Sequence, residues 1–158
     1  MRQSEKEWSV FTRRFAESHK AVEKVAEFLA RERKLRVTIP SAELAPNISK
    51  STDYIDKGDI ICHTANGKEY IIEVKGTKTE FTSAKDYPYK TVIINEVVKA
   101  HRIPAFAYFV VNRNRTHAFV VKTDTMEHWT IRHIKDSERG DSEDVYFCDM
   151  GWGEFIEL

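Results

Sequence analysis

The chain has 158 residues, with 25 Lys and Arg balanced by 25 Asp and Glu, a size that suits one globular domain with its own core. No apolar run is long enough to span a bilayer and the first ten residues lack the apolar stretch of a secretory signal, so we expect a cytoplasmic protein with no membrane partner. Two cysteines suggest neither a disulfide framework nor a zinc site.

The charge is unevenly distributed along the chain. Residues 1–36 carry ten Lys and Arg against six Asp and Glu, whereas residues 125–158 carry three against nine. One interpretation is a basic face that meets phosphates while the acidic end lies elsewhere. The other is a pair of solvated surfaces that largely neutralise each other, and charge alone favours this second interpretation.

Residues 4–34 are predicted to be helical, with a break near residues 18–19 that would divide them into two helices. Residues 35–39, before Pro40, predict a short strand, and the turn-rich residues 40–52 predict an irregular segment. The helix is predicted because apolar residues recur at three- and four-residue steps: Trp8, Phe11, Phe15, Val22, Val25, Phe28 and Leu29.

The next segment is the clearest in the chain. Residues 59–64 and 68–75 are rich in β-forming residues, and Asn66-Gly67 lies between them. Asn-Gly is the strongest short hairpin signal, because both positions tolerate positive φ. We therefore expect two antiparallel strands joined by a two-residue turn.

The rest of the chain alternates loops, strands and one helix. Residues 76–90 are expected to form a loop, and residues 91–94 a strand or the start of a helix. This order of elements predicts an α/β or α+β sheet with helices packed on it. Further predictions are a helix over 95–102 that ends before Pro104, strands over 105–111 and 118–122, and edge strands over 129–135 and 145–148.

Three charged residues of the hairpin are predicted to meet. Glu73 and Lys75 share a face of their strand, because side chains two residues apart point the same way. With a turn at Asn66-Gly67, position 59 pairs near position 74, which brings Asp59 beside both. Two carboxylates suit Mg²⁺, for which Mn²⁺ can substitute, and a lysine can serve the attacking water or the developing charge. This combination predicts phosphodiester hydrolysis.

Gly58-Asp59-Ile60 and, thirteen intervening residues after Asp59, Glu73-Val74-Lys75 resemble the signature of the PD-(D/E)XK nuclease superfamily. That superfamily includes restriction enzymes, Holliday-junction resolvases and repair nucleases. Gly58 stands where the family usually has Pro. The resemblance implies a restriction-endonuclease-like core, in which a central mixed β-sheet is flanked by helices in the order α-β-β-β-α-β. A single domain would span residues 1–158, with its core over about 20–122 and extra strands in a C-terminal extension over 123–158.

The first helix of this family often supplies a further acid. Glu23 resembles that position best, with Glu27 and Glu17 as alternatives. Asp53 and Asp56, which precede the hairpin, are read as turn residues more readily than as metal ligands.

Basic residues near the hairpin are candidate nucleic-acid contacts. Lys78, Lys85 and Lys90 alternate with aromatic residues in the loop 76–90, a composition that fits contact with phosphates and bases. An ordinary loop that uses its aromatic residues to attach itself to the body is an equally good interpretation. Arg113 and Arg115, in a polar turn, are further candidates for phosphate contact.

The sequence therefore predicts a Mg²⁺-dependent DNA endonuclease, structure-selective or accessory, of a kind that would fit phage or mobile-element DNA metabolism. Cutting both strands of a duplex needs two active sites, so a homodimer is expected. One alternative is a catalytically silent nucleic-acid-binding or protein-interaction module on the same fold. Another is an RNase with the same metal chemistry.

Overall fold

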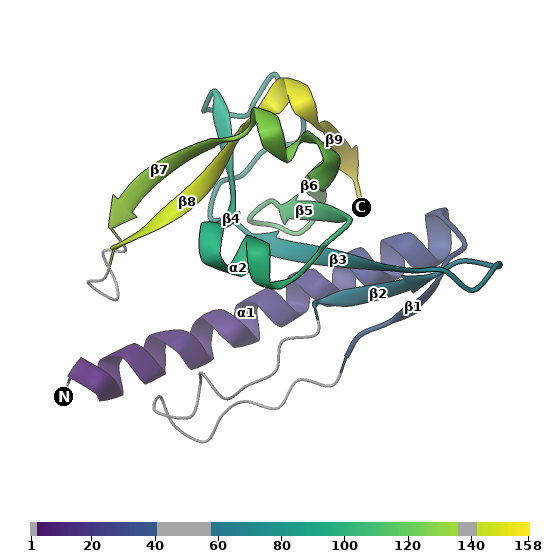
Figure 1. The fold of residues 1–158 in the computed structure, drawn as a ribbon, viewed down its shortest axis with the longest axis horizontal. Helices are drawn as coiled ribbons and strands as arrows, with labels where there is room; N and C mark the ends of the chain where they lie inside the picture. The colour runs from purple at the N-terminus through teal and green to yellow at the C-terminus, as the bar shows by residue number, and fades with distance from the viewer. Residues whose placement is uncertain (1–2, 41–57, 136–141) are drawn as a thin grey trace.

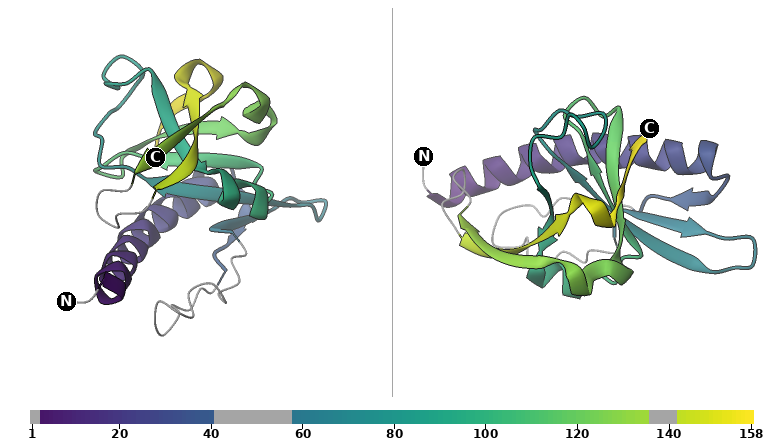
Figure 2. Two further views of the ribbon diagram at one scale, coloured as in Figure 1. Left: turned by 60° about the vertical axis from the view of Figure 1, so that its left-hand side comes forward. Right: turned by 90° about the horizontal axis from the view of Figure 1, so that it is seen from above.

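A computed structural model describes residues 3–40, 58–135 and 142–158 of the chain. These ranges contain one long and one short α-helix, nine strands arranged in two sheets, and two short 3-10 helices over Thr123–His128 and Met150–Trp152. The long helix, α1, rises obliquely across Figure 1 from the N-terminus below the smaller sheet to the level of β3, and runs along one side of the sheets in the view from above in Figure 2.

Helix α1 runs without interruption over Gln3–Glu32, so the predicted break near residues 18–19 is wrong. The predicted apolar stripe is confirmed at its C-terminal half, where Val22, Val25, Phe28 and Leu29 are buried. The side chains of the other three residues of the stripe lie outside the described part of the chain. Strand β1, Arg36–Thr38, follows the helix as predicted.

The larger sheet has six strands in the order β1-β2-β3-β5-β6-β9. Its neighbouring strands are antiparallel except for β3 and β5, which are parallel and joined through β4 and α2. The sequence predicted all of these strands but the last. The strands are β2 Ile60–His63, β3 Glu69–Gly76, β5 Ala107–Val111, β6 His117–Lys122 and β9 Glu154–Glu157.

The smaller sheet has three antiparallel strands in the order β4-β8-β7. Strand β4, Thr91–Glu96, settles the choice between strand and helix left open for residues 91–94, and the helix that follows, α2, is confined to Val97–Arg102. Strand β7, Thr130–Lys135, is an edge strand as predicted. Strand β8, Ser142–Asp149, was expected at an edge but lies at the centre, because β4 pairs along its other side.

The two faces of the larger sheet are covered differently. One face packs on α1, with Ile72 and Val74 of β3 in an apolar core that also holds Phe109 of β5. The opposite face packs on the smaller sheet and α2, where Tyr108 and Val110 of β5 meet Val92 and Cys148. The expected sheet flanked by helices is therefore a sheet with one long helix on one face, and a second sheet with a short helix on the other.

The residues predicted to form a C-terminal extension belong to both sheets, because β7 and β8 complete the smaller one and β9 pairs with β6. In the described ranges, neither helix combines the length and apolar character that crossing a bilayer demands.

Candidate functional site

The β2–β3 hairpin carries the three residues on which the functional prediction depends. Its register pairs Ile60 with Ile72 and His63 with Glu69. The loop is three residues long, 65–67: Thr64 N–H donates to Lys68 C=O, Gly67 N–H donates to Thr64 C=O, and Gly67 has φ +82°. A type I turn followed by a left-handed glycine is the usual three-residue hairpin. The predicted two-residue turn is thus wrong by one residue.

This one-residue shift of register changes which residue of β3 lies nearest to Asp59. Continuing the observed pairing by one residue past Ile60 and Ile72 sets Asp59 opposite Glu73, rather than opposite Val74. Residues directly opposite on antiparallel strands point to the same face. Asp59 and Glu73 therefore flank the last paired residues of the hairpin, Ile60 and Ile72.

The ladder ends at Asp59 because the backbone turns there. Gly58 has φ +92°, a conformation open to glycine and closed to proline, whose ring fixes φ near −65°. A Cβ at position 58 would lie 2.5 Å from Ile71 Cγ2 and 3.5 Å from Glu73 Oε1. The chain therefore passes close over the Glu73 side chain in a left-handed conformation that excludes proline at position 58.

Where the strand pairing stops, the Asp59 side chain replaces a backbone carbonyl as the hydrogen-bond acceptor. Val74 N–H donates to Asp59 Oδ2 at 2.8 Å. Hydrogen-bonded pairs alternate along an antiparallel ladder, so a continued β2 would have reached Val74 through residue 58. The carboxylate of Asp59 is thus held against the backbone of β3, one residue beyond Glu73.

Glu73 and Lys75 share a face of β3, as predicted. Their partners in the parallel register are Tyr108 and Val110 of β5, which belong to the core under the smaller sheet. Glu73 is 4% exposed, whereas Asp59 and Lys75 are half-buried. On the side of the sheet opposite α1, Glu73 therefore lies in the interior, and Asp59 and Lys75 lie closer to the surface.

Two residues that the sequence did not single out adjoin this pair of acids. Tyr108 is fully buried beside Glu73, and Asn95 Nδ2 donates to Tyr108 Oη at 3.3 Å. Burial raises the pKa of the Tyr108 phenol; the Asn95 hydrogen bond lowers it, and the charges of Glu73 and Asp59 raise it further. The available signals were a tyrosine inside the apolar run 105–111 and an asparagine ending the β-branched run 91–94.

The donor set of this cluster fits a magnesium ion. Asp59 and Glu73 offer carboxylate oxygens, and Mg²⁺ is usually held by one or two carboxylates together with waters and substrate phosphates. No larger group exists in the described ranges, where no three His, Cys, Asp or Glu side chains gather in an arrangement that could hold a metal. Asp53 and Asp56 lie outside the described residues.

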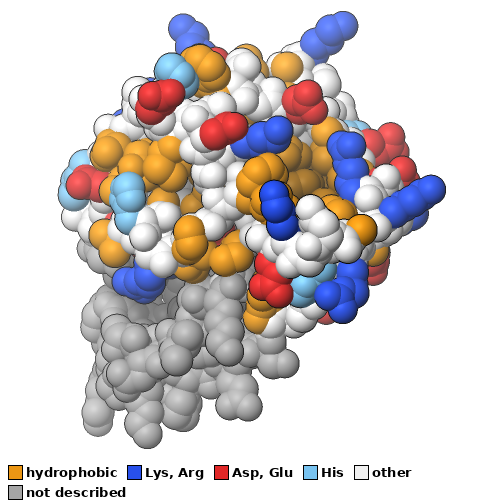
Figure 3. Space-filling model, turned by 45° about the vertical axis from the view of Figure 1, so that its right-hand side comes forward, with side chains coloured by type: hydrophobic (Ala, Val, Ile, Leu, Met, Phe, Trp, Pro, Cys, Tyr) orange, Lys and Arg blue, Asp and Glu red, His pale blue; other side chains and the backbone are white. Residues whose placement is uncertain are grey.

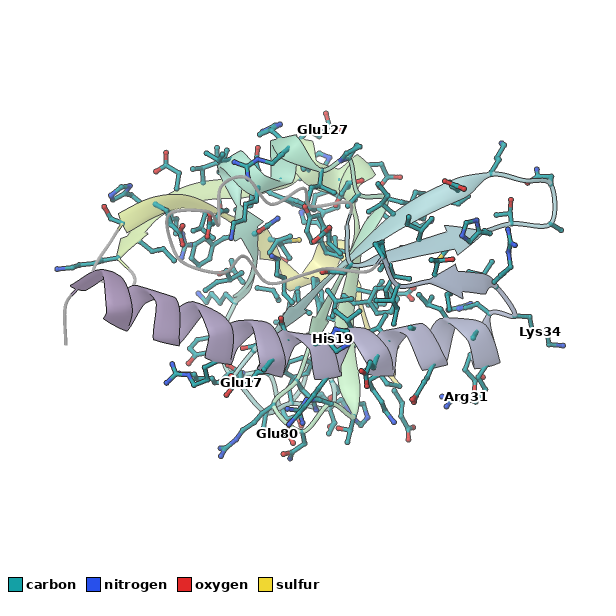
Figure 4. All side chains as sticks on the ribbon, turned by 90° about the horizontal axis from the view of Figure 1, so that it is seen from below. Glu17, His19, Arg31, Lys34, Glu80 and Glu127 are labelled. Carbon is teal, nitrogen blue, oxygen red and sulfur yellow. The ribbon has the colours of Figure 1, made fainter. Side chains whose placement is uncertain are left out.

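The structure does not bring Glu23 to these residues. Helix α1 packs on the face of the sheet opposite Glu73, and Glu23 points to solvent, 3.0 Å from His19 Nε2. Glu17 and Glu27 are exposed on the same helix. Figure 4 shows Glu17 and His19 along α1, on the near side in this view from below.

The loop 76–90 is attached to the body by its aromatic residues. Phe81 is 1% exposed and packs edge-on against Tyr87 and Phe155, with ring centroids 5.4 Å apart in each pair. Asp86 accepts hydrogen bonds from Thr82 and Ser83, which lower the pKa of its carboxyl. These aromatic contacts favour the structural interpretation of Phe81 and Tyr87, while Lys78, Lys85, Lys90 and Tyr89 remain exposed.

The turn that carries Arg113 and Arg115 lies against this loop. Arg113 N–H donates to Thr79 C=O at 3.0 Å, and Asn112 Nδ2 donates to Phe81 C=O at 2.7 Å. These contacts place Arg113 and Arg115 near Lys78, at the end of β3 that follows Lys75. On the face drawn in Figure 3, Lys and Arg are scattered among Asp, Glu and hydrophobic side chains.

Comparison with models of protein families, with curated proteins and with solved structures finds no match to this chain.

Proposed function

We propose that this protein is a Mg²⁺-dependent endonuclease that hydrolyses phosphodiester bonds of DNA. One observation carries the proposal: Asp59 accepts a hydrogen bond from Val74 N–H and precedes the last pair of the hairpin, Ile60 and Ile72, while Glu73 directly follows that pair and shares its face of β3 with Lys75. This is the arrangement that the resemblance to PD-(D/E)XK nucleases implies. The carboxylates and the ammonium come from one rigid hairpin, as an accurately positioned site requires.

Each residue has a distinct role in this proposal. Asp59 and Glu73 would hold the ion through their carboxylate oxygens, and the Val74 N–H that donates to Asp59 Oδ2 keeps the Asp59 side chain in place. Bound there, Mg²⁺ supplies Lewis acidity at a phosphoryl oxygen and a water of lowered pKa. Lys75 orients the attacking water or stabilises the charge that develops on the phosphate. Lys78, Lys85, Lys90, Arg113 and Arg115 would contact the nucleic-acid backbone.

The burial of Glu73 favours a second candidate function. A carboxylate that is 4% exposed presents little surface to a hydrated ion, and buried charges are also kept for structural reasons. A catalytically silent nucleic-acid-binding module would retain the fold and the basic loop without turnover. Such a module would bind DNA without cutting it, whatever divalent cation is added.

The test of the proposal is cleavage by variants with matched charge changes. Glu73→Gln and Lys75→Ala should each reduce Mg²⁺-dependent cleavage of DNA by on the order of 100-fold or more, since each removes a group that acts on the transition state. Glu69→Gln is the matched control, because Glu69 lies on the same strand but at the turn end, paired with His63. Cleavage that survives in both variants at the wild-type rate would come from a contaminant and would overturn the proposal.

Further arms of the same experiment identify the metal and the substrate. Ca²⁺ should support binding with little cleavage, because it fills oxygen sites with less exacting geometry than Mg²⁺. Duplex DNA, branched DNA and RNA are assayed side by side, and faster cutting of RNA would select the RNase alternative.

Substrate binding is tested through its salt dependence. Replacing Lys78, Lys85 and Lys90 by Ala should flatten the log–log dependence of DNA binding on salt by about one unit for each lysine that pairs with a phosphate. Lys20→Ala with Lys34→Ala is the control and should leave the slope unchanged, since Lys20 is exposed on α1 and Lys34 is exposed just beyond its end.

A further inference from the structure

The loop 76–90 and the turn that joins β5 to β6 stay hydrogen-bonded beyond the end of their strands. Thr77 N–H donates to Val111 C=O at 2.9 Å, next to the last pair of the parallel register. Further along, Arg113 N–H donates to Thr79 C=O at 3.0 Å. The first residues of the loop and the turn are therefore parts of one connected structure, at the end of β3 that carries the candidate site.

Asn112 is the buried residue at the centre of this connection, with 2% of its surface exposed. Its Oδ1 accepts from Thr116 N–H at 2.8 Å and from His117 N–H at 3.2 Å. Because a backbone N–H can only donate, these two bonds fix the orientation of the amide. Its Nδ2 then donates to Phe81 C=O at 2.7 Å and to Thr116 Oγ1 at 2.9 Å. The four bonds use both N–H donors and both acceptor positions of the amide.

The turn enclosed by these bonds holds an arginine in an uncommon conformation. Arg115 has φ +57°, a left-handed value that glycine and asparagine adopt more readily than arginine. Arg115 N–H donates to Asn112 C=O at 3.1 Å, and Thr116 N–H, one residue on, donates to Asn112 Oδ1. Such a conformation persists where the surrounding structure enforces it. Asn112 supplies that enforcement through both its backbone and its side chain.

Three cations of the proposed nucleic-acid surface lie on the segments that Asn112 joins. Arg113 and Arg115 belong to the turn and Lys78 to the loop; Arg113 and Lys78 are exposed and Arg115 is half-buried. Glu80 is an acid at the same contact, where its carboxylate accepts from Asn114 N–H at 3.4 Å. Three cations and this acid leave a net positive charge, which attracts phosphates.

We propose that Asn112 is a positioning residue that holds the turn 112–116 and the loop 77–81 together as one rigid surface for backbone phosphates. The inference rests on the proposed function, because it names the residue that orders substrate contacts beside the same site. Phosphate contacts fix the register and orientation of a nucleic acid on a protein. A surface ordered before binding also loses less conformational entropy when the nucleic acid binds.

The test is binding of duplex DNA in Ca²⁺ as a function of salt. Asn112→Ala should weaken binding on the order of 10-fold at low salt and flatten the log–log salt dependence by about one unit or more, as phosphate contacts are lost. Its Mn²⁺ affinity, measured by calorimetry without DNA, should equal that of wild type. In cleavage assays KM should rise while kcat changes little, because these contacts bind substrate and transition state alike.

Val25→Ala is the control for lost stability, because Val25 is fully buried under α1 and away from this surface. Folded Val25→Ala should keep the wild-type salt dependence and KM. Equal losses of DNA binding in Val25→Ala and Asn112→Ala would reduce Asn112 to a structural residue and overturn the proposal.

A double-mutant cycle tests whether Asn112 acts through the turn. Arg113→Ala should weaken DNA binding more in wild type than in Asn112→Ala, where the turn is already displaced. Full additivity of the two changes would contradict positioning. If Asn112→Ala does not fold, Arg115→Gly carries the test, since glycine adopts φ +57° readily. Arg115→Gly should flatten the salt dependence by about one unit without lowering the Tm, and an unchanged salt dependence would overturn the proposal.

Binding and cleavage together distinguish failure of this inference from failure of the proposed function. If wild type binds and cuts DNA and folded Asn112→Ala does both equally well, only the positioning role is refuted. If wild type binds DNA without cutting it, the endonuclease proposal fails, and the salt dependence of Asn112→Ala still decides the positioning role. If wild type binds no DNA, both are overturned.

Discussion

The two faces of the six-stranded sheet solve the same packing problem with different chemistry. Among the described residues, the face under α1 is closed by apolar side chains, from Ala21 to Leu29 of the helix onto Ile72, Val74 and Phe109. The face under the smaller sheet encloses Glu73 and Asn95 beside Tyr108. A long amphipathic helix needs only a continuous apolar stripe to dock. The second face is covered by strands and a short helix, and side chains of these strands, such as Asn95 of β4, place polar groups in the core that also holds Glu73.

This difference indicates where stability and function are divided in the molecule. Residues of the α1 face should affect the free energy of unfolding and leave cation binding alone. Residues of the Glu73 face should affect both stability and cation binding, and some substitutions there should raise one while they lower the other. Three substitutions test this division, one on each face and one at the edge where the hairpin strands separate.

The largest effect is expected on the helix-covered face. Phe28 is 7% exposed and its ring lies 6.3 Å from that of Phe109. Phe28→Ala should lower the free energy of unfolding by about 3–5 kcal/mol, because it removes buried apolar surface and leaves a cavity. Denaturant unfolding measures this, with Val98→Ala as the control, since Val98 is 66% exposed and should change stability by about 0.5 kcal/mol or less. A change in Mn²⁺ affinity in folded Phe28→Ala would contradict the division between faces.

An intermediate effect is expected at the edge, from Gly58→Ala. The substitution forces an L-residue to φ +92° and places a methyl group 2.5 Å from Ile71 Cγ2. Together these should cost about 1–3 kcal/mol. Gly67→Ala is a matched control, because Gly67 has φ +82° but open space around it. Equal costs at the two glycines would mean that the close approach over Ile71 has no energetic weight.

The smallest effect, of opposite sign, is expected on the Glu73 side. Asp59→Asn keeps an oxygen that can accept from Val74 N–H and removes one of two neighbouring negative charges. The metal-free protein should become more stable by about 1 kcal/mol, as substitutions at functional sites often do.

Melting curves with and without Mg²⁺ complete this comparison. Saturating Mg²⁺ should raise the Tm of wild type, because the ion binds only the folded state, and should raise that of Asp59→Asn much less. Destabilisation by Asp59→Asn, together with equal Mg²⁺ shifts in both proteins, would make Asp59 a structural turn residue.

Local patterns predicted most elements, and pairing between distant segments accounts for the errors. The periodicity of residues 4–34 predicted α1, and the β-rich runs around Asn66-Gly67 predicted the hairpin. The turn was misjudged by one residue because Gly67 alone takes positive φ. The central place of β8 and the existence of β9 depend on partners far along the chain, which local propensity does not record.

The residues of the candidate site likewise fall into those that local patterns predicted and those that depend on distant segments. Alternation along one strand was enough to unite Glu73 and Lys75, and the hairpin was enough to add Asp59. Glu23 was predicted from the resemblance to PD-(D/E)XK nucleases, and the packing of α1 on the far face separates it from Glu73. Tyr108 and Asn95 were missed because no local pattern reports that β4, β5 and β3 meet at one point.

The pairing of β4 with β8 has a consequence for the order in which the protein acquires its structure during synthesis. The buried residues of the helix-covered face all occur by Ala118, whereas those that close the opposite face extend to Cys148. Strand pairings between distant segments form slowly, and nascent chains fold as their segments emerge. A growing chain can therefore assemble the buried part of the α1 face first, to which the half-buried Ile156 and Leu158 are added later, and keep Glu73 in contact with water until β8 leaves the ribosome. The acid is withdrawn from solvent only in the last steps of folding, when the hairpin that carries it is already anchored on the helix.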